Sequence, residues 1–596
     1  MVASDRTLRT TILHSPFRTW VVRLLCLWWI GGCGIPAAWG QTDSVSNLPQ
    51  MAAGAAKVVE VSRVFDPWIS DAGKINFLPQ LDDTVVPALK FDYRLAARPL
   101  VRLLPLRPIP PAKMGRERIE QLSPFYLKFG GGNNYSPWVE GYVSGGRSER
   151  LTYSLDLQHF SSWGTLEVGD KLQDDAQEVA APYSRTGVQA QLRGFTKKYH
   201  FNYYLGGRYR HAYSRFYGAG DTLVRAQDTL WKSPYSRHLG GVLFELGSTY
   251  LDSTHFQYLV RGELDGYSDN FDGSQWHAGA TFEGHKDFDG QRYGGLLEVR
   301  HYGLSLGSAE HPNTIVSLAP WVKLYGDRWR VVAGVDLTYD SNGAQSEMHV
   351  YPRGHISYDI IRQFFIPYFE IDGRLEVADR VRLSEENPFL HPHEKVWNSS
   401  RNMELRFGAR GKLNNDFGFH LYGAYALVDS MRFSVNGIAR REVKKLHYQN
   451  GLLSTMHSVY DRGSELHLAA ELHYALTSRF SAGLRADYWS YSLIQLAAPW
   501  HEPTAMGTLF ANYNLRDKIY AGLDFHLTGG RQARDAAGDI VNLPTMLDLN
   551  LQARYRLGVH TSVFVDLRNL LFQRYYRYHL YPHHRLQAYG GIILEF

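Results

Sequence analysis

Cysteine is almost absent from this chain, which has 2 cysteines in 596 residues. Both of them, Cys26 and Cys33, lie within the first 40 residues, in a segment that resembles a cleaved signal peptide. Removal of that segment leaves a mature chain without any thiol. This excludes disulfides and every metal or redox site that depends on cysteine.

Long hydrophobic runs are absent too. Beyond residue 40 there is no run of about 18 apolar residues, which excludes a transmembrane helix. The net charge is only +5, with both signs interspersed, so the sequence gives no reason to expect a nucleic-acid partner. The sequence also lacks a Gly-x-Ser-x-Gly motif, a His-Glu-x-x-His motif and a phosphate-binding glycine loop. We therefore predict neither an enzyme nor a bound cofactor.

The N-terminus predicts export. Arginines at positions 6, 9, 18 and 23 precede the apolar stretch 24–30, and Ala38-Trp39-Gly40 resembles a signal-peptidase site. Residues 1–40 are therefore expected to be removed. The alternative is a lipobox ending at Cys33, which would leave that cysteine lipidated as the first mature residue.

The last strand has two different faces. Leu586, Ala588, Gly590, Ile592, Leu594 and Phe596 alternate with Gln587, Tyr589, Gly591, Ile593 and Glu595. A strand with one apolar face and a C-terminal aromatic residue is typical of an outer-membrane β-barrel. Leu594 and Phe596 are therefore candidates for a barrel-assembly signal. The expected partners are the outer-membrane lipids and the barrel-assembly machinery.

The same period of two recurs in paired segments along the chain. Residues 402–413 and 417–427 alternate on either side of a turn at Asn414-Asn415-Asp416, which predicts an antiparallel hairpin. Three further hairpins are predicted, at 314–325 with 329–339, 466–474 with 480–488, and 547–557 with 563–567. The 38 Tyr and 14 Trp favour a barrel with aromatic girdles. A mean hydropathy of -0.32 does not argue against it, because half of each barrel strand is polar.

The mature chain divides into two parts. Residues 41–120 are rich in proline and lack alternation, so we expect a non-barrel lead. Residues 121–596 carry strands of about ten residues, which predicts an all-β, large antiparallel transmembrane barrel of about 22 (22–24) strands. The alternation breaks between Met431 and Gln449, where we expect a missed or split strand. The connections 492–503, 528–544 and 570–585 are expected to lie outside the cell.

A set of short motifs is spread along the chain. They are Val58-Val59-Glu60-Val61, the segment from Phe65-Asp66-Pro67-Trp68 to Ile75-Asn76, Leu78-Pro79, Asp82-Asp83, Tyr368, Asp372-Gly373, Asn387-Pro388-Phe389, Trp500-His501-Glu502-Pro503, the segment Asn512–Ile519, Asn569-Leu570-Leu571-Phe572, Tyr575-Tyr576 and Tyr581-Pro582. Together these motifs resemble a Bacteroidetes group of TonB-dependent-receptor-like barrels. The closing hairpin is the most specific of these signals. The resemblance covers most of residues 58–596 and implies outer-membrane transport, with TonB or another periplasmic protein as partner.

The chain departs from the receptor pattern at its N-terminus. The segment 41–120 is shorter than a receptor plug domain and carries no convincing TonB box. A barrel of about 22 strands is wide enough to need filling. The lead and the long loops could fold inward, a separate partner could fill the lumen, or the lumen could stay open. Phe65, Trp68 and Ile69 are the candidate self-plug residues of the lead.

Charged residues on the lumen face form the candidate solute path. They are Glu404, Arg406, Arg410, Lys412, Glu465, His467, Glu471, His473, Arg485, Asp487, Asp548, Arg554 and Arg556. These side chains could attract an anionic solute, or pair across strands as ordinary lumen packing. Glu465, His467, Glu471 and His473 share one strand face and could hold a cation, but lumen packing is the favoured interpretation, and we predict no metal site.

A second candidate metal site is His391-Pro392-His393-Glu394, for which a solvated loop is the favoured interpretation. Two functions then remain. The first is an outer-membrane transport barrel whose loops at 162–182, 211–236, 377–400 and 528–544 capture a solute. The second is a sealed barrel that serves as a scaffold in envelope assembly or secretion.

Overall fold

The computed structural model describes residues 123–596, except for 146–149, 169–176, 197, 219–231, 251–253, 308, 344, 437–454, 477–478 and 535–538. The predictions of a signal peptide, of lipidation at Cys33 and of a self-plug through Phe65, Trp68 and Ile69 lie outside the described residues.

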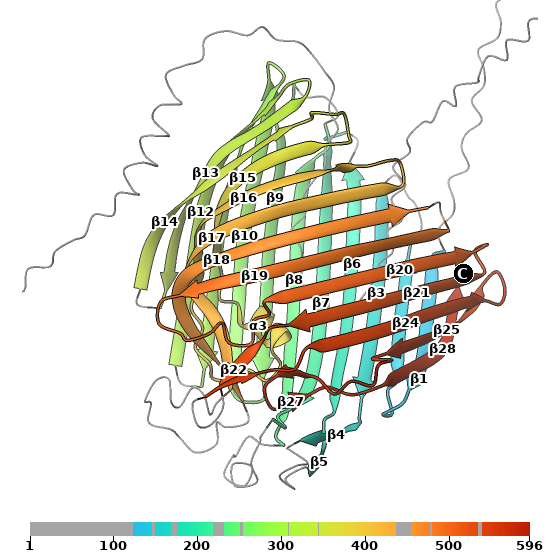
Figure 1. The fold of residues 1–596 in the computed structure, drawn as a ribbon. Helices are drawn as coiled ribbons and strands as arrows, with labels where there is room; N and C mark the ends of the chain where they lie inside the picture. Colours follow the sequence, from blue (N-terminus) through green and yellow to red (C-terminus); the bar gives the residue numbers. More distant parts are fainter. Residues whose placement is uncertain are drawn as a thin grey trace, which may run out of the picture. The chain divides into compact units, whose positions relative to one another are not determined.

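The strands form one closed antiparallel ring (Figure 1). It has 22 strands, and the first pairs with the last, so the ring has no free edge. The ring strands are β1 (Phe125–Gly132), β2 (Trp138–Ser144), β3 (Leu151–Ser162), β6 (Tyr183–Thr196), β7 (Phe201–Arg215), β8 (Pro234–Ser248), β9 (Gln257–Asp269), β10 (Gly273–Phe288), β11 (Gln291–Leu306), β12 (Ala309–Tyr325), β13 (Trp329–Asn342), β14 (Gln345–Tyr358), β15 (Ile366–Glu376), β16 (Ser399–Lys412), β17 (Phe417–Asn436), β18 (Met456–Ala475), β19 (Phe480–Leu493), β20 (Ala505–Leu515), β21 (Ile519–Gly529), β24 (Met546–Arg556), β25 (Thr561–Arg568) and β28 (Gln587–Glu595). The prediction of a barrel of 22–24 strands is confirmed.

Shorter elements lie in the connections. They are the strand pairs β4 (Thr165–Val168) with β5 (Gln177–Ala180), β22 (Gln532–Arg534) with β23 (Ile540–Asn542), and β26 (Tyr576–Tyr578) with β27 (Tyr581–Pro582), and the helix α3 (Arg380–Glu386). None of the helices in the described part of the chain is long and apolar enough to cross a membrane.

The four predicted hairpins are present. β16 pairs with β17, β12 with β13, β18 with β19, and β24 with β25, all antiparallel. The predicted faces of the last strand are also confirmed. Tyr589 and Ile593 on the polar face are 3% and 4% exposed, whereas Phe596 is 53% exposed. Period-two alternation therefore identified both the strands and their inward face.

The outward face of the ring is apolar. Leu264 is 60% exposed, and Phe407 and Val350 are each 63% exposed. Such a surface would be unstable in water but is what a bilayer requires. Outward aromatic residues, among them Trp329 and Tyr358 at one end and Tyr339 and Tyr425 further along, suit the headgroup levels on either side of the apolar band.

The two ends of the ring differ. One end, the turn end, carries the chain terminus, where Phe596 pairs with Phe125. The other, the loop end, carries the long connections 163–182, 377–398, 494–504, 530–545 and 569–586. The connections predicted to be external, 492–503, 528–544 and 570–585, thus share one end, and α3 and the short strand pairs lie there too (Figure 1).

A β-bulge explains why the alternation breaks after residue 428. The pairing of β17 with β18 shifts between Val428 and Met431, and Ser430 has a left-handed φ of 57°. Beyond the bulge, Phe433 and Val435 point inward and are each 1% exposed. The prediction of a missed or split strand is wrong as far as Asn436, because β17 continues unbroken to that residue. Residues 437–454 lie outside the described part.

Candidate functional site

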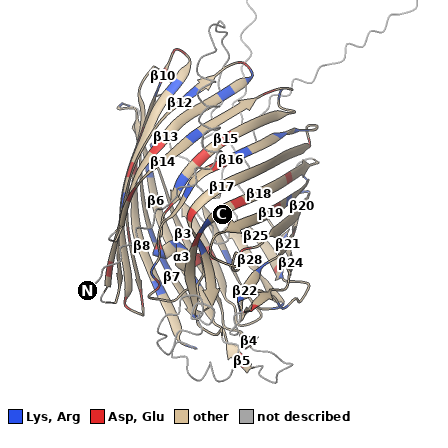
Figure 2. Ribbon diagram, turned by 60° about the vertical axis from the view of Figure 1, so that its left-hand side comes forward, with Lys and Arg blue, Asp and Glu red and all other residues tan. Residues whose placement is uncertain are grey.

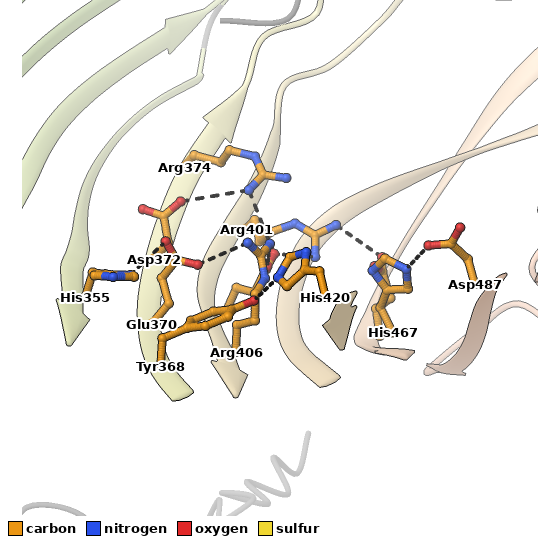
Figure 3. Close-up of polar contacts among 12 residues, drawn as sticks. His355, Tyr368, Glu370, Asp372, Arg374, Arg401, Arg406, His420, His467 and Asp487 are labelled. Atoms are coloured by element: carbon orange, nitrogen blue, oxygen red, sulfur yellow. Dashed lines mark hydrogen bonds and ion pairs between the residues drawn. The ribbon is translucent and has the colours of Figure 1, made fainter. Parts of the chain in front are cut away.

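Charged side chains line the lumen face of β14 to β19, and basic and acidic positions are interspersed along these strands (Figure 2). A first chain of contacts begins at His355, whose Nδ1 lies 3.7 Å from Glu370 Oε1. The other oxygen of Glu370 accepts a hydrogen bond from Arg406 at 3.1 Å, and Arg406 also binds Glu404 (Figure 3). Acid and base therefore alternate across β14, β15 and β16.

Glu404 is the centre of this chain. It is only 6% exposed, and Arg401 and Arg374 lie 3.2 Å and 3.8 Å from its Oε2. Arg401 continues the chain to Glu465 on β18 at 3.1 Å. The buried carboxylate of Glu404 is thus compensated by three guanidinium groups, as a buried charge requires.

A second chain crosses β15 to β19. The Tyr368 hydroxyl lies 2.7 Å from His420 Nε2, and His420 Nδ1 lies 3.6 Å from Glu471. Glu471 binds Arg485, whose side chain is 47% exposed. Because Arg485 lies on the open lumen face, it is accessible to a solute in a way that Glu404 is not.

The second chain ends at Asp487. Arg485 Nε donates to Asp487 Oδ2 at 2.7 Å. His467 Nε2 lies 2.9 Å from Asp487 Oδ1 (Figure 3). The His467 ring stacks on Trp489 with centroids 4.6 Å apart. These contacts connect neighbouring strands and hold the wall together.

The remaining predicted lumen residues lie apart from these chains. Arg554 binds Glu595 at 2.7 Å, and Arg556 lies 3.8 Å from the same carboxylate. The Arg410 guanidinium lies 5.9 Å from the Tyr368 ring, and Lys412 is exposed at the turn end of β16. Asp548 is on β24, beside the loop residue Tyr575.

The four residues proposed as a cation site do not converge. Glu465 pairs with Arg401, His467 with Asp487 and Glu471 with Arg485, while His473 lies near the Phe510 ring. Within the described ranges, no group of three or more His, Cys, Asp or Glu residues could hold a metal ion.

Residues 377–398, which connect β15 to β16, form a cap segment at the loop end. Its helix α3 begins at the N-cap Asp379, whose Oδ1 accepts the Val381 N–H at 3.0 Å, and ends at Asn387, just before Pro388. Gln275 on β10 donates to the same Asp379 oxygen at 2.8 Å. The cap segment is therefore tied to the barrel wall where its helix begins.

Arg380 anchors the cap segment in the wall. It is 0% exposed and donates to the Tyr235 hydroxyl at 3.1 Å and to the His391 carbonyl at 3.0 Å. Tyr235 and Tyr267 both donate to the Asp269 carboxylate, at 3.3 Å and 3.1 Å. The buried Arg380 guanidinium is thus linked to the Asp269 carboxylate through tyrosine hydroxyls. Loss of Arg380 would leave several buried polar groups without this partner.

The segment around His391 is also packed. Glu394 is 3% exposed and accepts from the Ser458 N–H at 3.0 Å, and its other oxygen lies 2.7 Å from His457 Nδ1. His391 stacks on His457, and burial together with His457 lowers the pKa of His391 to about 3. The interpretation of residues 391–394 as a solvated loop is therefore wrong, because this segment packs against β18.

The cap segment spans the lumen. Glu385 of α3 binds Arg210 on β7 at 3.1 Å, and Glu386 binds Arg432 on β17 at 2.8 Å. In the ring of 22 strands, β17 is the tenth strand after β7, so the two arginines lie on nearly opposite walls. Adjacent helix positions point in different directions, which lets the two carboxylates reach both walls.

Apolar side chains from several loops pack around the cap segment. Phe389 stacks on Tyr581 with centroids 3.9 Å apart, and both contact Tyr217. This cluster includes Leu166, Val168, Val179, Ala181 and Met456. The loop end therefore has a hydrophobic core of its own, built from residues that a sequence pattern would place in solvated loops.

A second core lies beside the bulge of β17. Trp500, 2% exposed, packs with Phe433, Val435 and Val459. His501 Nδ1 lies 2.6 Å from the Ser434 carbonyl, and its Nε2 accepts the His579 N–H at 3.0 Å. Burial lowers the pKa of His501 to about 4. The loops 494–504 and 569–586 are thus fastened to β17.

Sequence reasoning did not identify Arg210, Arg380 or Arg432, because their partners are distant in sequence and no local motif marks them. The one available signal was the cluster of aromatic motifs at Asn387-Pro388-Phe389, Trp500-His501 and Tyr581-Pro582. The structure brings all of them to the loop end.

No family model and no curated protein matches the sequence. Solved structures do match the fold. The FrpB iron transporter of Neisseria meningitidis (F3-3 variant) is 9% identical with a TM-score of 0.61, over 80% of this chain and 82% of that one. The ferric-catecholate import receptor Fiu of E. coli K12 is 9% identical with a TM-score of 0.57, over 80% and 82%.

The ferripyoverdine receptor of Pseudomonas aeruginosa is 11% identical with a TM-score of 0.56, over 81% of this chain and 73% of that one. The resemblance to a Bacteroidetes group remains a prediction. The chain therefore has the closed 22-stranded barrel fold of TonB-dependent outer-membrane receptors.

Proposed function

We propose that this protein is an outer-membrane transport barrel whose outer mouth is closed at rest by its own cap segment. The observation that supports the proposal is the contrast between the lumen wall and the mouth of the barrel. A charged and partly exposed wall lies beneath a mouth that the cap segment spans from Arg210 to Arg432. A charged wall suits the passage of a polar solute, and the cap segment would control its entry.

The test is single-channel conductance of the mature chain, residues 41–596, in a planar bilayer. The wild type is compared with a variant in which residues 378–397 are replaced by a short Gly-Ser linker. We expect rare openings in the wild type and stable openings in the variant. A folded variant that stays closed would contradict the proposal.

The second candidate is a sealed scaffold for envelope assembly or secretion. The packed loop end favours it, because the two apolar clusters around Phe389 and Trp500 resemble a fixed core more than a hinge. On this hypothesis, cap replacement alters stability but not permeability, so the same recording separates the two functions.

Coupling to TonB remains a prediction. Residues 41–120, including Phe65, Trp68 and Ile69, would carry a periplasmic contact or a self-plug, and they lie outside the described residues. Replacing Phe65 and Trp68 with Ser is expected to raise leakage through the barrel if this lead fills the lumen. Unchanged leakage in the cap-replaced background would count against a self-plug.

A further inference from the structure

One carboxylate at the end of α3 has an unusual concentration of positive charge around it. Arg432 on β17 donates to Glu386 Oε2 at 2.8 Å, and Arg382 Nε lies 3.7 Å from Oε1. The Glu386 carbonyl accepts from Tyr578 at 3.1 Å and from Arg577 at 3.4 Å. We call these five residues the latch. Two guanidinium groups thus lie against the Glu386 carboxylate, and a third lies against the carbonyl of the same residue.

Glu385 and Glu386 occupy the last turn of α3, where a negative charge opposes the helix dipole. Within the helix, the contact of Glu386 with Arg382 one turn earlier offsets part of this effect. The shorter contacts of both carboxylates are with the walls, at Arg210 and Arg432. Glu386 joins the cap segment both to β17 and to the loop 569–586, which makes it the contact that fastens this end of α3.

Water reaches the latch. The side chains of Glu386 and Arg382 are 42% and 43% exposed, and that of Arg432 is 24% exposed. Exposed ion pairs are weak, typically about 0–1 kcal/mol, so a competing anion can replace one partner. By contrast, Arg380 at the other end of α3 is fully buried and has no such access.

We propose that the latch is an oxyanion-binding site whose resting occupant is Glu386, and that a solute bearing a carboxylate or phosphate group replaces this side chain. The observed carboxylate shows that the site accepts an oxyanion, and the guanidinium fork fits both carboxylate and phosphate. The exchange frees the end of α3 from Arg432 on β17. This inference rests on the proposed function and names the class of solute.

The test is calorimetric titration of the folded mature chain with inorganic pyrophosphate, with tricarballylate and, as a cation of similar size, with spermidine. Glu386→Ala removes the carboxylate that competes with an added anion. This variant is expected to bind the anion about tenfold more tightly, because the anion no longer has to displace Glu386 from the arginines. Arg432→Gln is expected to abolish it. Glu385→Gln, which alters the Arg210 contact, is the matched control and should leave the affinity unchanged.

Binding of pyrophosphate alone assigns a phosphate solute, and binding of tricarballylate alone assigns a carboxylate. Equal affinity in Glu386→Ala and the wild type would overturn the inference, as would binding that survives Arg432→Gln or a Glu386→Ala variant that binds neither anion. The proposed function is tested separately by conductance of the cap-replaced variant. An open variant without anion binding therefore rejects only the latch site.

Discussion

The wall of the lumen and its mouth use charge in different ways. Along β14 to β19, partners lie on one strand or at most two strands apart, as with Glu370 and Arg406, and they reinforce a sheet that backbone hydrogen bonds already hold. At the mouth, Arg210 and Arg432 bind one short helix from nearly opposite walls. The difference indicates that the wall charges preserve a shape, whereas the mouth charges preserve one position of a connecting segment.

The largest expected effect comes from changing which side chains of β17 face the mouth beyond the bulge. Insertion of one alanine between Met431 and Arg432 shifts the alternation by one residue and turns Phe433 and Val435 to the opposite face. Exposure of buried side chains of this size costs about 1.5–3 kcal/mol each, so the core around Trp500 should be lost. The measurement is hydrogen exchange of residues 494–504, compared with that of β10 to β12.

A Ser430→Gly variant keeps the bulge and serves as the control. Slow exchange of residues 494–504 in the insertion variant would contradict the inward position of Phe433 and Val435.

The next effect separates the mouth from the wall directly. Arg380→Met leaves the Tyr235 hydroxyl and the His391 carbonyl without their donor, which should destabilise the cap segment by about 2–4 kcal/mol. That is about a 30-fold to 1,000-fold rise in the detached fraction. Limited proteolysis within residues 377–398 would measure it.

Arg485→Gln is the matched change in the wall, where the side chain is 47% exposed and an ion pair is worth about 0–1 kcal/mol. It should not alter proteolysis of the cap segment. Equal sensitivity in the two variants would remove the distinction between wall and mouth.

Acid should loosen the mouth. Burial lowers the pKa of His391 to about 3 and that of His501 to about 4, against about 6.5 in an unpacked chain. The packed state therefore binds fewer protons. Its stability is fully present above pH of about 6.5 and falls by about 1.4 kcal/mol per pH unit for each histidine as the pH is lowered toward their pKa values.

Glu502 acts in the opposite sense, because burial raises its pKa, so the packed state gains protons there as the pH falls. Because two histidines oppose one carboxyl group, the packed state still loses stability as the pH falls. Hydrogen exchange of the cap segment at pH 7 and pH 5 checks the sign. Faster exchange at pH 7 than at pH 5, corrected for intrinsic rates, would contradict it.

The smallest effect is expected in the wall. Arg406→Gln removes one of three guanidinium groups around Glu404, and Arg374 and Arg401 remain. We expect a loss of about 1 kcal/mol or less in barrel stability, because the remaining charges still compensate the carboxylate. Denaturant unfolding in detergent measures it. A loss several times larger would mean that the wall pairs are as critical as the mouth contacts.

Alternation was sufficient to predict the barrel. A strand with one face toward lipid must alternate apolar and polar residues. This local alternation was enough to predict the two faces of the last strand, the hairpin of β16 with β17 and the range of strand number. The lumen-facing charges could be recognised for the same reason. Their partners were only partly predictable, as the link between Arg401 and Glu465 shows.

The mouth could not be predicted, because its contacts join residues far apart in the sequence. Glu385 and Arg210 are separated by 175 positions, and no local pattern connects them. Arg380 looks like an ordinary loop arginine until Tyr235 and Asp269 are placed beside it. The bulge at Ser430 was visible only as a loss of period, which a missed strand would also produce.

The most direct test of the closed mouth uses the absence of cysteine beyond residue 33. In the mature chain, Arg210→Cys with Glu385→Cys allows a flexible bis-thiol-reactive linker to join α3 to β7, and single-channel conductance is recorded before and after cross-linking. The account predicts that loss of the ion pair raises the frequency of openings, that the cross-link suppresses them, and that cleavage of the linker restores them. Conductance that is the same in all three states would contradict the claim that the cap segment closes this barrel.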